Sequence, residues 1–178
     1  YGSFFRYYWH EKIVDFPNAH FQCSMLCLAI IYKNKLKDNK YFNEKNIYRW
    51  IIASLNYTKK IQHSDGSFDE FYPNEKGRAV TAIIAYDIIS TYMQLKDELT
   101  KDEKDEFREV LDKSFHYIQS LPPLEEGVLA NHIAMIMCFL MLYYHEFSED
   151  YALEKYEEYK RSLLQNYSNE GWFNEYDG

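Results

Sequence analysis

Two adjoining stretches of sequence decide the fold: RAVTAIIAYDIISTYMQL over residues 78–95 and KDEKDEFREVLDKSFHYIQS over residues 101–120. The first is apolar on every face, so it predicts a helix that is buried on all sides. The second carries apolar residues at spacings of three and four, with charged residues on the opposite face. That pattern predicts a helix that covers a core on one side only. Its stripe consists of Phe107, Leu111, Ser114 and Ile118.

The alternation of an apolar helix with an amphipathic one extends to both sides of this pair. Apolar helices are predicted near residues 18–36 and 126–146, and amphipathic helices near residues 43–62 and 149–166. No run alternates apolar and polar residues for long enough to indicate a strand. The fold class is therefore all-α. Helices in this order are typical of an α/α toroid, in which hairpins form an inner ring packed against an outer ring.

A short sequence repeat supports this interpretation. The segments GSFDEF at residues 66–71 and GWFNEY at residues 171–176 share one pattern, and each follows an amphipathic helix that ends in glutamine, at Gln62 and Gln165. The chain has room for three hairpins, and the aromatic lead-in from Phe4 to Trp9 suggests the end of a further outer helix. A closed ring of six hairpins needs about twice this length. Residues 1–178 are thus expected to be a single all-α domain, a fragment with three to four hairpins of a larger toroid.

Composition excludes several classes of partner. The 178 residues carry 28 acidic and 20 basic side chains, a net charge of −8, so a nucleic-acid partner is not expected. The longest apolar stretch, residues 133–144, is shorter than the roughly 20 residues that a membrane span needs. Cys23, Cys27 and Cys138 lie in apolar runs and are interpreted as buried thiols. An aromatic content of 19% suits a groove lined with rings, as in many sugar-binding sites.

No cofactor or metal is predicted. The sequence has no HExxH, CxxC or calcium-loop spacing and no glycine-rich phosphate loop. The chain begins at Tyr1 without a charged-then-apolar leader, so it is interpreted as a processed product or an excised piece, and no compartment is predicted.

Five motifs resemble the toroid domain of heparinase II/III-like proteins. They are WHEK at residues 9–12, DFPNAHFQ at 15–22, DGSFDEFYPNE at 65–75, VLANH at 128–132 and EGWFNEYDG at 170–178. The family members of known activity are polysaccharide lyases, in which an α/α toroid precedes a β-sandwich domain and the groove of the toroid holds the active site. The resemblance therefore implies an acidic polysaccharide or oligosaccharide as partner, with the rest of the toroid and a β-sandwich domain outside this chain.

The resemblance also implies catalytic residues for β-elimination from a uronate polymer. That reaction removes a weakly acidic proton beside a carboxylate, so the carboxylate must be neutralised and a base must be supplied. The adjacent Asn-His pair of these lyases maps onto Asn131, as carboxylate neutraliser, and His132, as acid, base or orienter. Tyr176 is the candidate for the tyrosine base, with a residue beyond Gly178 as the alternative. A structural interpretation stays open: Asn131 caps its helix, and His132 is satisfied in the core.

The loop near residues 65–77 and the C-terminal repeat supply the candidate substrate-binding residues. These are His63, Phe68, Glu70, Tyr72, Arg78, Trp172 and Glu175. The rings suit a sugar groove or serve as buried anchors of the loops. A positive field for a polyanion has to be local, from Lys76, Arg78 and the histidines His63 and His132.

Two other functions remain open. A pair of acids in this loop, Asp69 with Glu70 or Glu75, suits a six-hairpin glycoside hydrolase, although such acids also cap helices. A non-catalytic carbohydrate-binding or scaffold toroid keeps the rings without the proton-transfer residues. The products distinguish the three functions, because only a lyase leaves an unsaturated uronate.

Overall fold

The computed structural model describes residues 1–4, 18–122 and 130–173. Within these residues the chain is helical, and its β-type pairing consists of two isolated bridges, Phe68 with Gly77 and Tyr167 with Phe173. The prediction of an all-α chain is confirmed. The elements are a short 3₁₀ helix η1 (His20–Cys23), α1 (Ser24–Lys33), α2 (Lys45–Ile61), α3 (Arg78–Leu95), α4 (Lys101–Ser120), α5 (Ala130–Phe147) and α6 (Asp150–Gln165).

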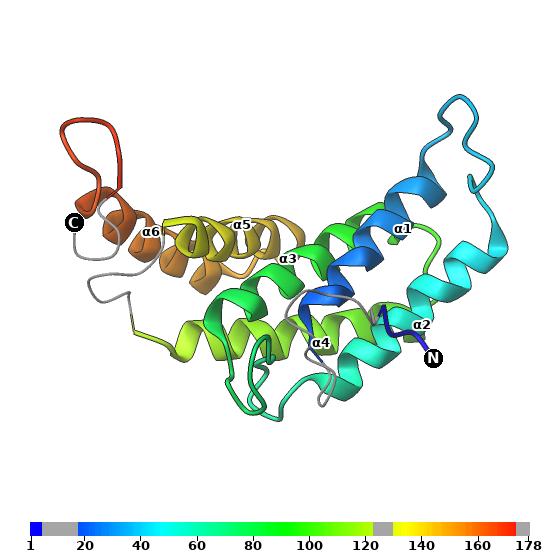
Figure 1. The fold of residues 1–178 in the computed structure, drawn as a ribbon, viewed down its shortest axis with the longest axis horizontal. Coiled ribbons are helices and arrows are strands. Elements are labelled where there is room, and N and C mark those ends of the chain that lie inside the picture. The colour runs from blue at the N-terminus through cyan, green and yellow to red at the C-terminus, as the bar shows by residue number, and fades with distance from the viewer. Residues whose placement is uncertain (5–17, 123–129, 174–178) are drawn as a thin grey trace.

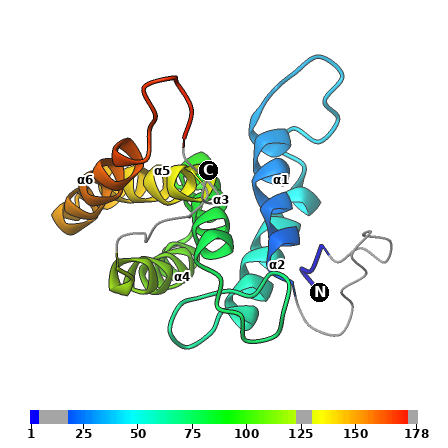
Figure 2. The ribbon, with the colours of Figure 1, turned by 60° about the vertical axis from the view of Figure 1, so that its left-hand side comes forward.

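The helices pair in chain order and form two layers. Each of α1, α3 and α5 packs on the helix that follows it, and α3 also contacts both α1 and α5. The contacts of α4 with α2 and α6 are fewer, so the layer of α2, α4 and α6 is more open (Figures 1 and 2). The alternation of the two helix types therefore gives stacked hairpins. Closure of the stack into a toroid remains a prediction.

The outer helix α4 shows why these residues fold as they do. Thr100 accepts from the backbone N–H of Glu103, and the Glu103 carboxylate accepts from the backbone N–H of Thr100 at 2.8 Å, which is a capping box. The predicted stripe faces the core, because Phe107, Leu111 and Ile118 have no exposed surface. The start and the buried face of this helix are thus both encoded locally.

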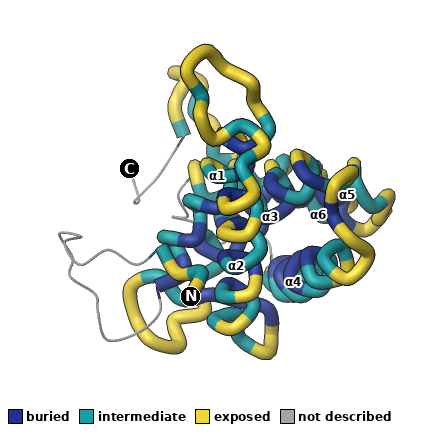
Figure 3. Tube along the Cα trace, turned by 90° about the vertical axis from the view of Figure 1, so that its right-hand side faces the viewer, coloured by how far each residue is buried: buried dark blue, intermediate teal, exposed yellow. Residues whose placement is uncertain are grey.

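Burial on all sides is observed for α3 alone of the three apolar helices. It has a neighbour of its own layer on either side, whereas α1 and α5 each have one. Cys27 and Ile30 on α1 and Cys138 on α5 are consequently exposed, and Cys23 is partly exposed. The interpretation of Cys27 and Cys138 as buried thiols was wrong, because it assumed a neighbour on both sides of every apolar helix. Figure 3 shows exposed and partly buried segments along α1 and α5.

A glycine turn connects α2 to the hairpin that follows. Gly66 has a φ of 93°, a conformation that favours glycine, and a Cβ at this position would lie 2.0 Å from the carbonyl oxygen of Lys113. The turn therefore lies directly against the backbone of α4. The side-chain amide of Gln62 secures it by donating to the Gly66 carbonyl at 3.1 Å and to Ser114 Oγ at 3.0 Å.

A second turn of this kind lies one hairpin earlier. Gly2 has a φ of 92°, and a Cβ there would lie 1.9 Å from the carbonyl oxygen of Ala53 on α2. The amide of Gln22 donates to the Gly2 carbonyl at 3.2 Å and to Ser54 Oγ at 3.0 Å. The stack thus repeats one contact, a glycine turn held by a glutamine amide against the outer helix of the next hairpin.

None of the helices in the described part of the chain combines the length and the hydropathy that crossing a membrane requires.

Candidate functional site

The segments that precede α1, α3 and α5 meet at one end of the molecule. The backbone N–H of Ala19 donates to the Asp69 carbonyl at 3.0 Å, which joins the start of the first hairpin to the loop before α3. The Arg78 guanidinium donates to the Pro122 carbonyl at 3.2 Å, which joins the start of α3 to the segment leading to α5. The three inner helices run in the same general direction (Figure 1), so their N-termini share this end.

The loop at residues 65–77 is built on acidic side chains. Asp65 accepts from the backbone N–H of Ser67 at 3.1 Å and from the Lys76 ammonium at 2.7 Å. Burial of Asp65 opposes ionisation, but the hydrogen bonds from Lys76 and Ser67 outweigh it and lower the pKa of Asp65 to about 2. This carboxylate is therefore ionised at neutral pH and holds the two ends of the loop together.

Two further carboxylates hold the tip of the same loop. Asp69 accepts from the backbone N–H groups of Asn74 at 2.8 Å and Lys76 at 3.0 Å. Glu75 accepts from the N–H groups of Glu70 at 3.0 Å and Phe71. Although burial acts against it, these backbone donors lower the pKa of Asp69. Asp69 and Glu75 thus satisfy backbone donors, and of the acids proposed for a hydrolase only Glu70 keeps its carboxylate outside this framework.

Two imidazoles lie against the adjacent acids of the loop. His63, just after α2, places Nε2 2.9 Å from Oδ1 of Asp69, and His20, at the start of η1, places Nδ1 3.2 Å from Oε1 of Glu70. A carboxylate at this distance restricts the orientation of the ring, and an oriented imidazole suits proton transfer. His20 was not among the candidates from the sequence, although it lies in the motif at residues 15–22 that supports the family resemblance.

A partly buried acid of α3, Asp87, lies beside Cys23 and His20. Burial raises the pKa of Asp87, and the hydrogen bond with Cys23 and the neighbouring His20 only partly offset that rise. Burial also raises the pKa of the Cys23 thiol, and the Asp87 carboxylate beside it raises it further. A thiol held protonated in this way is a poor nucleophile. Cysteine-based covalent catalysis therefore has no support at this position.

The Asn-His pair lies in the first turn of α5. Asn131 is exposed, and its Oδ1 accepts from the backbone N–H of His132 at 2.9 Å. His132 is partly buried. The positive end of the helix dipole lies at this turn, so it favours an anion beside Asn131. Tyr176 and Glu175 lie outside the described residues.

The aromatic candidates fall into two groups. Phe68 is fully buried, and its backbone N–H donates to Thr81 Oγ1 at 3.0 Å, so this ring anchors the loop and has no surface to offer a sugar. Tyr72 and Trp172 are exposed, at 71% and 52% of their surface. The sequence pattern could not separate these roles, because it does not show which rings face the core.

No group of three His, Cys, Asp or Glu side chains within residues 1–4, 18–122 and 130–173 is arranged to hold a metal ion. Comparisons with protein-family models, with curated proteins and with solved structures found no match to this chain.

Proposed function

We propose that this chain is the helical part of a polysaccharide lyase that binds an acidic polysaccharide at the end where α1, α3 and α5 begin. The observation that supports this most is the position of Asn131, an exposed amide in the first turn of α5, beside His132 and at the end that holds Arg78. An anionic sugar placed there meets an amide, an imidazole and the positive end of the helix dipole. Each of these favours a carboxylate.

The net charge of −8 is unfavourable to a polyanion, and the loop at residues 65–77 compensates only part of its own negative charge. Asp65, Asp69 and Glu75 are each engaged by donors of the loop, so part of their negative charge is compensated. Arg78 and Lys76 come from the same loop and helix start. Interactions of this kind weaken with salt, since exposed charges are screened over about 10 Å at 0.1 M.

The proposed reaction is β-elimination. Asn131 hydrogen-bonds the uronate carboxylate and stabilises the negative charge that develops when the neighbouring C–H is deprotonated. His132, or a tyrosine outside the described residues, takes that proton. The C–H electron pair becomes the new C=C bond, the bond to the glycosidic oxygen breaks, and the oxygen leaves with a proton from an acid. The products are an unsaturated uronate and a shortened polymer.

Ultraviolet absorbance of the unsaturated product tests the proposal. The chain is incubated with a panel of uronate polymers, and Asn131→Ala is compared with Asn56→Ala, an exposed asparagine of α2. Removal of a charge-stabilising donor costs about 10²–10³-fold in turnover, so we expect that loss for Asn131→Ala and none for Asn56→Ala. Equal turnover in both variants removes Asn131 from the mechanism.

A non-catalytic carbohydrate-binding domain is the second candidate. The hydrogen bond from the His132 N–H to Asn131 Oδ1 is also what a structural cap makes. Binding of a uronate polymer without release of unsaturated product identifies this function. Release of saturated sugars identifies a hydrolase, for which the engagement of Asp69 and Glu75 in the loop is unfavourable.

A further inference from the structure

The three outer helices share one register of inward-facing residues, with spacings of four, three and four. In α2 and α4 all four positions are buried, but in α6 the second and fourth, Tyr156 and Leu163, are only partly buried. Their counterparts in α4, Leu111 and Ile118, have no exposed surface. The positions are residues 47, 51, 54 and 58 in α2, 107, 111, 114 and 118 in α4, and 152, 156, 159 and 163 in α6.

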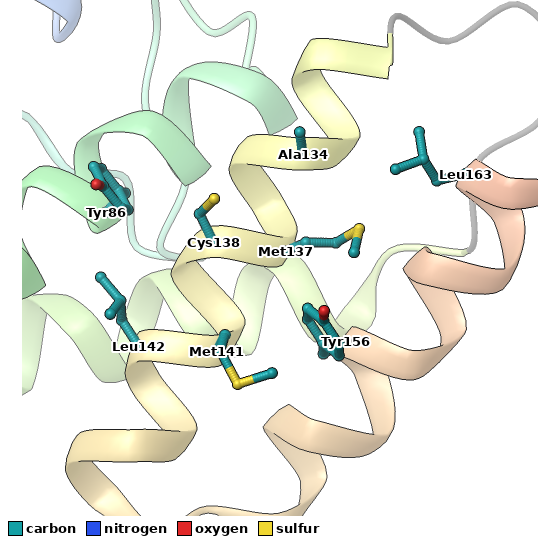
Figure 4. A pocket seen from close by; sticks show the side chains of 8 residues that line it. All are labelled: Tyr86, Ala134, Met137, Cys138, Met141, Leu142, Tyr156 and Leu163. Carbon is teal, nitrogen blue, oxygen red and sulfur yellow. The ribbon is translucent and has the colours of Figure 1, made fainter. Parts of the chain in front are cut away.

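The incomplete burial coincides with an apolar hollow of about 470 Å³ over α5. Tyr156 and Leu163 line it from α6, and Met137, Cys138 and Met141 line it from α5 (Figure 4). In the preceding hairpin, the corresponding space beside α3 and α4 is filled by α5, which packs on α3. The hollow therefore continues an interface that the chain already forms.

A third glycine turn follows α6, and its geometry repeats that of the Gly66 turn. Gly66 N–H donates to the His63 carbonyl at 2.9 Å, and Gly171 N–H donates to the Ser168 carbonyl at 3.2 Å. In the first turn, the backbone N–H of His63 donates to the Ser67 carbonyl at 3.0 Å. In the second turn, the backbone N–H of Ser168 donates to the Trp172 carbonyl at 2.7 Å. The φ of Gly171 is 97°, against 93° for Gly66.

The two turns differ in what lies beside them. A Cβ on Gly66 would meet the α4 backbone, whereas a Cβ on Gly171 would meet only Tyr167 Oη, at 3.7 Å, among the described residues. Gln165 is the last residue of α6 and lies six residues before Gly171, whereas Gln62 lies four residues before Gly66, so the two glutamines are not at equivalent positions. A turn that holds an outer helix elsewhere in the stack thus stands without one among the described residues here.

We infer that the surface formed by α5, α6 and the Gly171 turn binds a further helical hairpin of the same kind as α3 and α4. Its outer helix lies over Gly171, with a backbone carbonyl against the glycine, as the Lys113 carbonyl lies against Gly66. Its inner helix fills the hollow over α5. A second copy of this chain is a poorer fit, because the glycine contact sites on α2 and α4 are already filled by Gly2 and Gly66.

An extended chain tests the inference, with residues 67–122 appended directly after Gly171 as the probe hairpin. Cys27→Ala removes one of the two exposed thiols, which leaves Cys138 in the hollow as the accessible one. Labelling of Cys138 by a thiol reagent is then compared in the extended and unextended chains. We expect the extension to slow labelling about tenfold or more, because the thiol becomes reachable only when the added hairpin opens.

The matched control carries Gly171→Val in the extended chain. A side chain there has no room against a helix backbone, so Cys138 should label as fast as in the unextended chain. Equal labelling rates of Cys138 with and without the extension overturn the inference. This holds whether circular dichroism shows the added residues to be helical or unfolded, because binding to this surface is expected to stabilise their folded state. Concentration-dependent protection of Cys138 in the unextended chain overturns it in favour of a second copy. None of these outcomes depends on lyase activity.

Discussion

Replacing Gly66 by alanine should destabilise the chain strongly, and the cost can be worked from two contributions. A non-glycine residue near a φ of 93° is strained by about 1–2 kcal/mol. The added Cβ would also lie 2.0 Å from the Lys113 carbonyl oxygen, so the turn must move away from α4. Forced repacking of this kind costs about 1–3 kcal/mol. The expected loss in the free energy of unfolding is therefore about 2–5 kcal/mol, measured by urea unfolding followed by circular dichroism.

Gly171→Ala is the matched control, because it changes the same residue type in a turn with the same backbone hydrogen bonds. Its φ of 97° gives the same backbone strain, but the nearest atom of the described residues is 3.7 Å from the new Cβ. We expect this variant to lose only the strain of about 1–2 kcal/mol. If both variants lose the same free energy of unfolding, the close contact of Gly66 with α4 is not what stabilises the turn, and the argument from glycine contacts is wrong.

Three other measurements test separate parts of the structure. Gln62→Ala should lower the free energy of unfolding by about 1–3 kcal/mol, because backbone and hydroxyl acceptors on α4 lose their donor. Gln165→Ala should change the free energy of unfolding little, and equal effects of the two substitutions would contradict the assigned hydrogen bonds. The pKa of Asp65 is about 2 when folded, against an ordinary value of 3.8, so its stabilisation is full above about pH 4 and is lost as the pH falls toward 2. Urea midpoints should fall less over that range in Asp65→Asn than in the parent, and parallel curves would exclude this carboxylate. Two of the three thiols should react rapidly with a thiol reagent in the native protein, and Cys23 should react only on unfolding; fast reaction of all three would contradict its burial.

Local sequence patterns predicted the helices well. The helices expected at residues 78–95 and 101–120 are observed as Arg78–Leu95 and Lys101–Ser120, because their ends are set by local signals such as the capping box of Thr100. The helix expected to continue to residue 36 ends at Lys33. The side chain of Asn34 donates to the Ile30 carbonyl at 2.7 Å and so completes the last turn.

Contacts between distant segments were harder to predict. The His20–Glu70 pair joins residues 50 positions apart, and no periodicity links them. The pattern did place Asn131 and His132 at a helix start, but it could not tell a cap from a binding site, because both use the same amide oxygen. Full burial of Phe68, against partial burial of its counterpart Phe173, likewise depends on which turn has a helix beside it.

The shielding of α3 by a neighbour on each side determines how the stack can come apart. Because every hairpin is stabilised mainly by its neighbours, local unfolding should begin at either edge of the stack and proceed inward. The amide protons of α3 should accordingly be the last to exchange with deuterium, and those of α1 and α6 among the first. Any partner that covers an edge would then slow exchange throughout the stack, well beyond the residues that it touches.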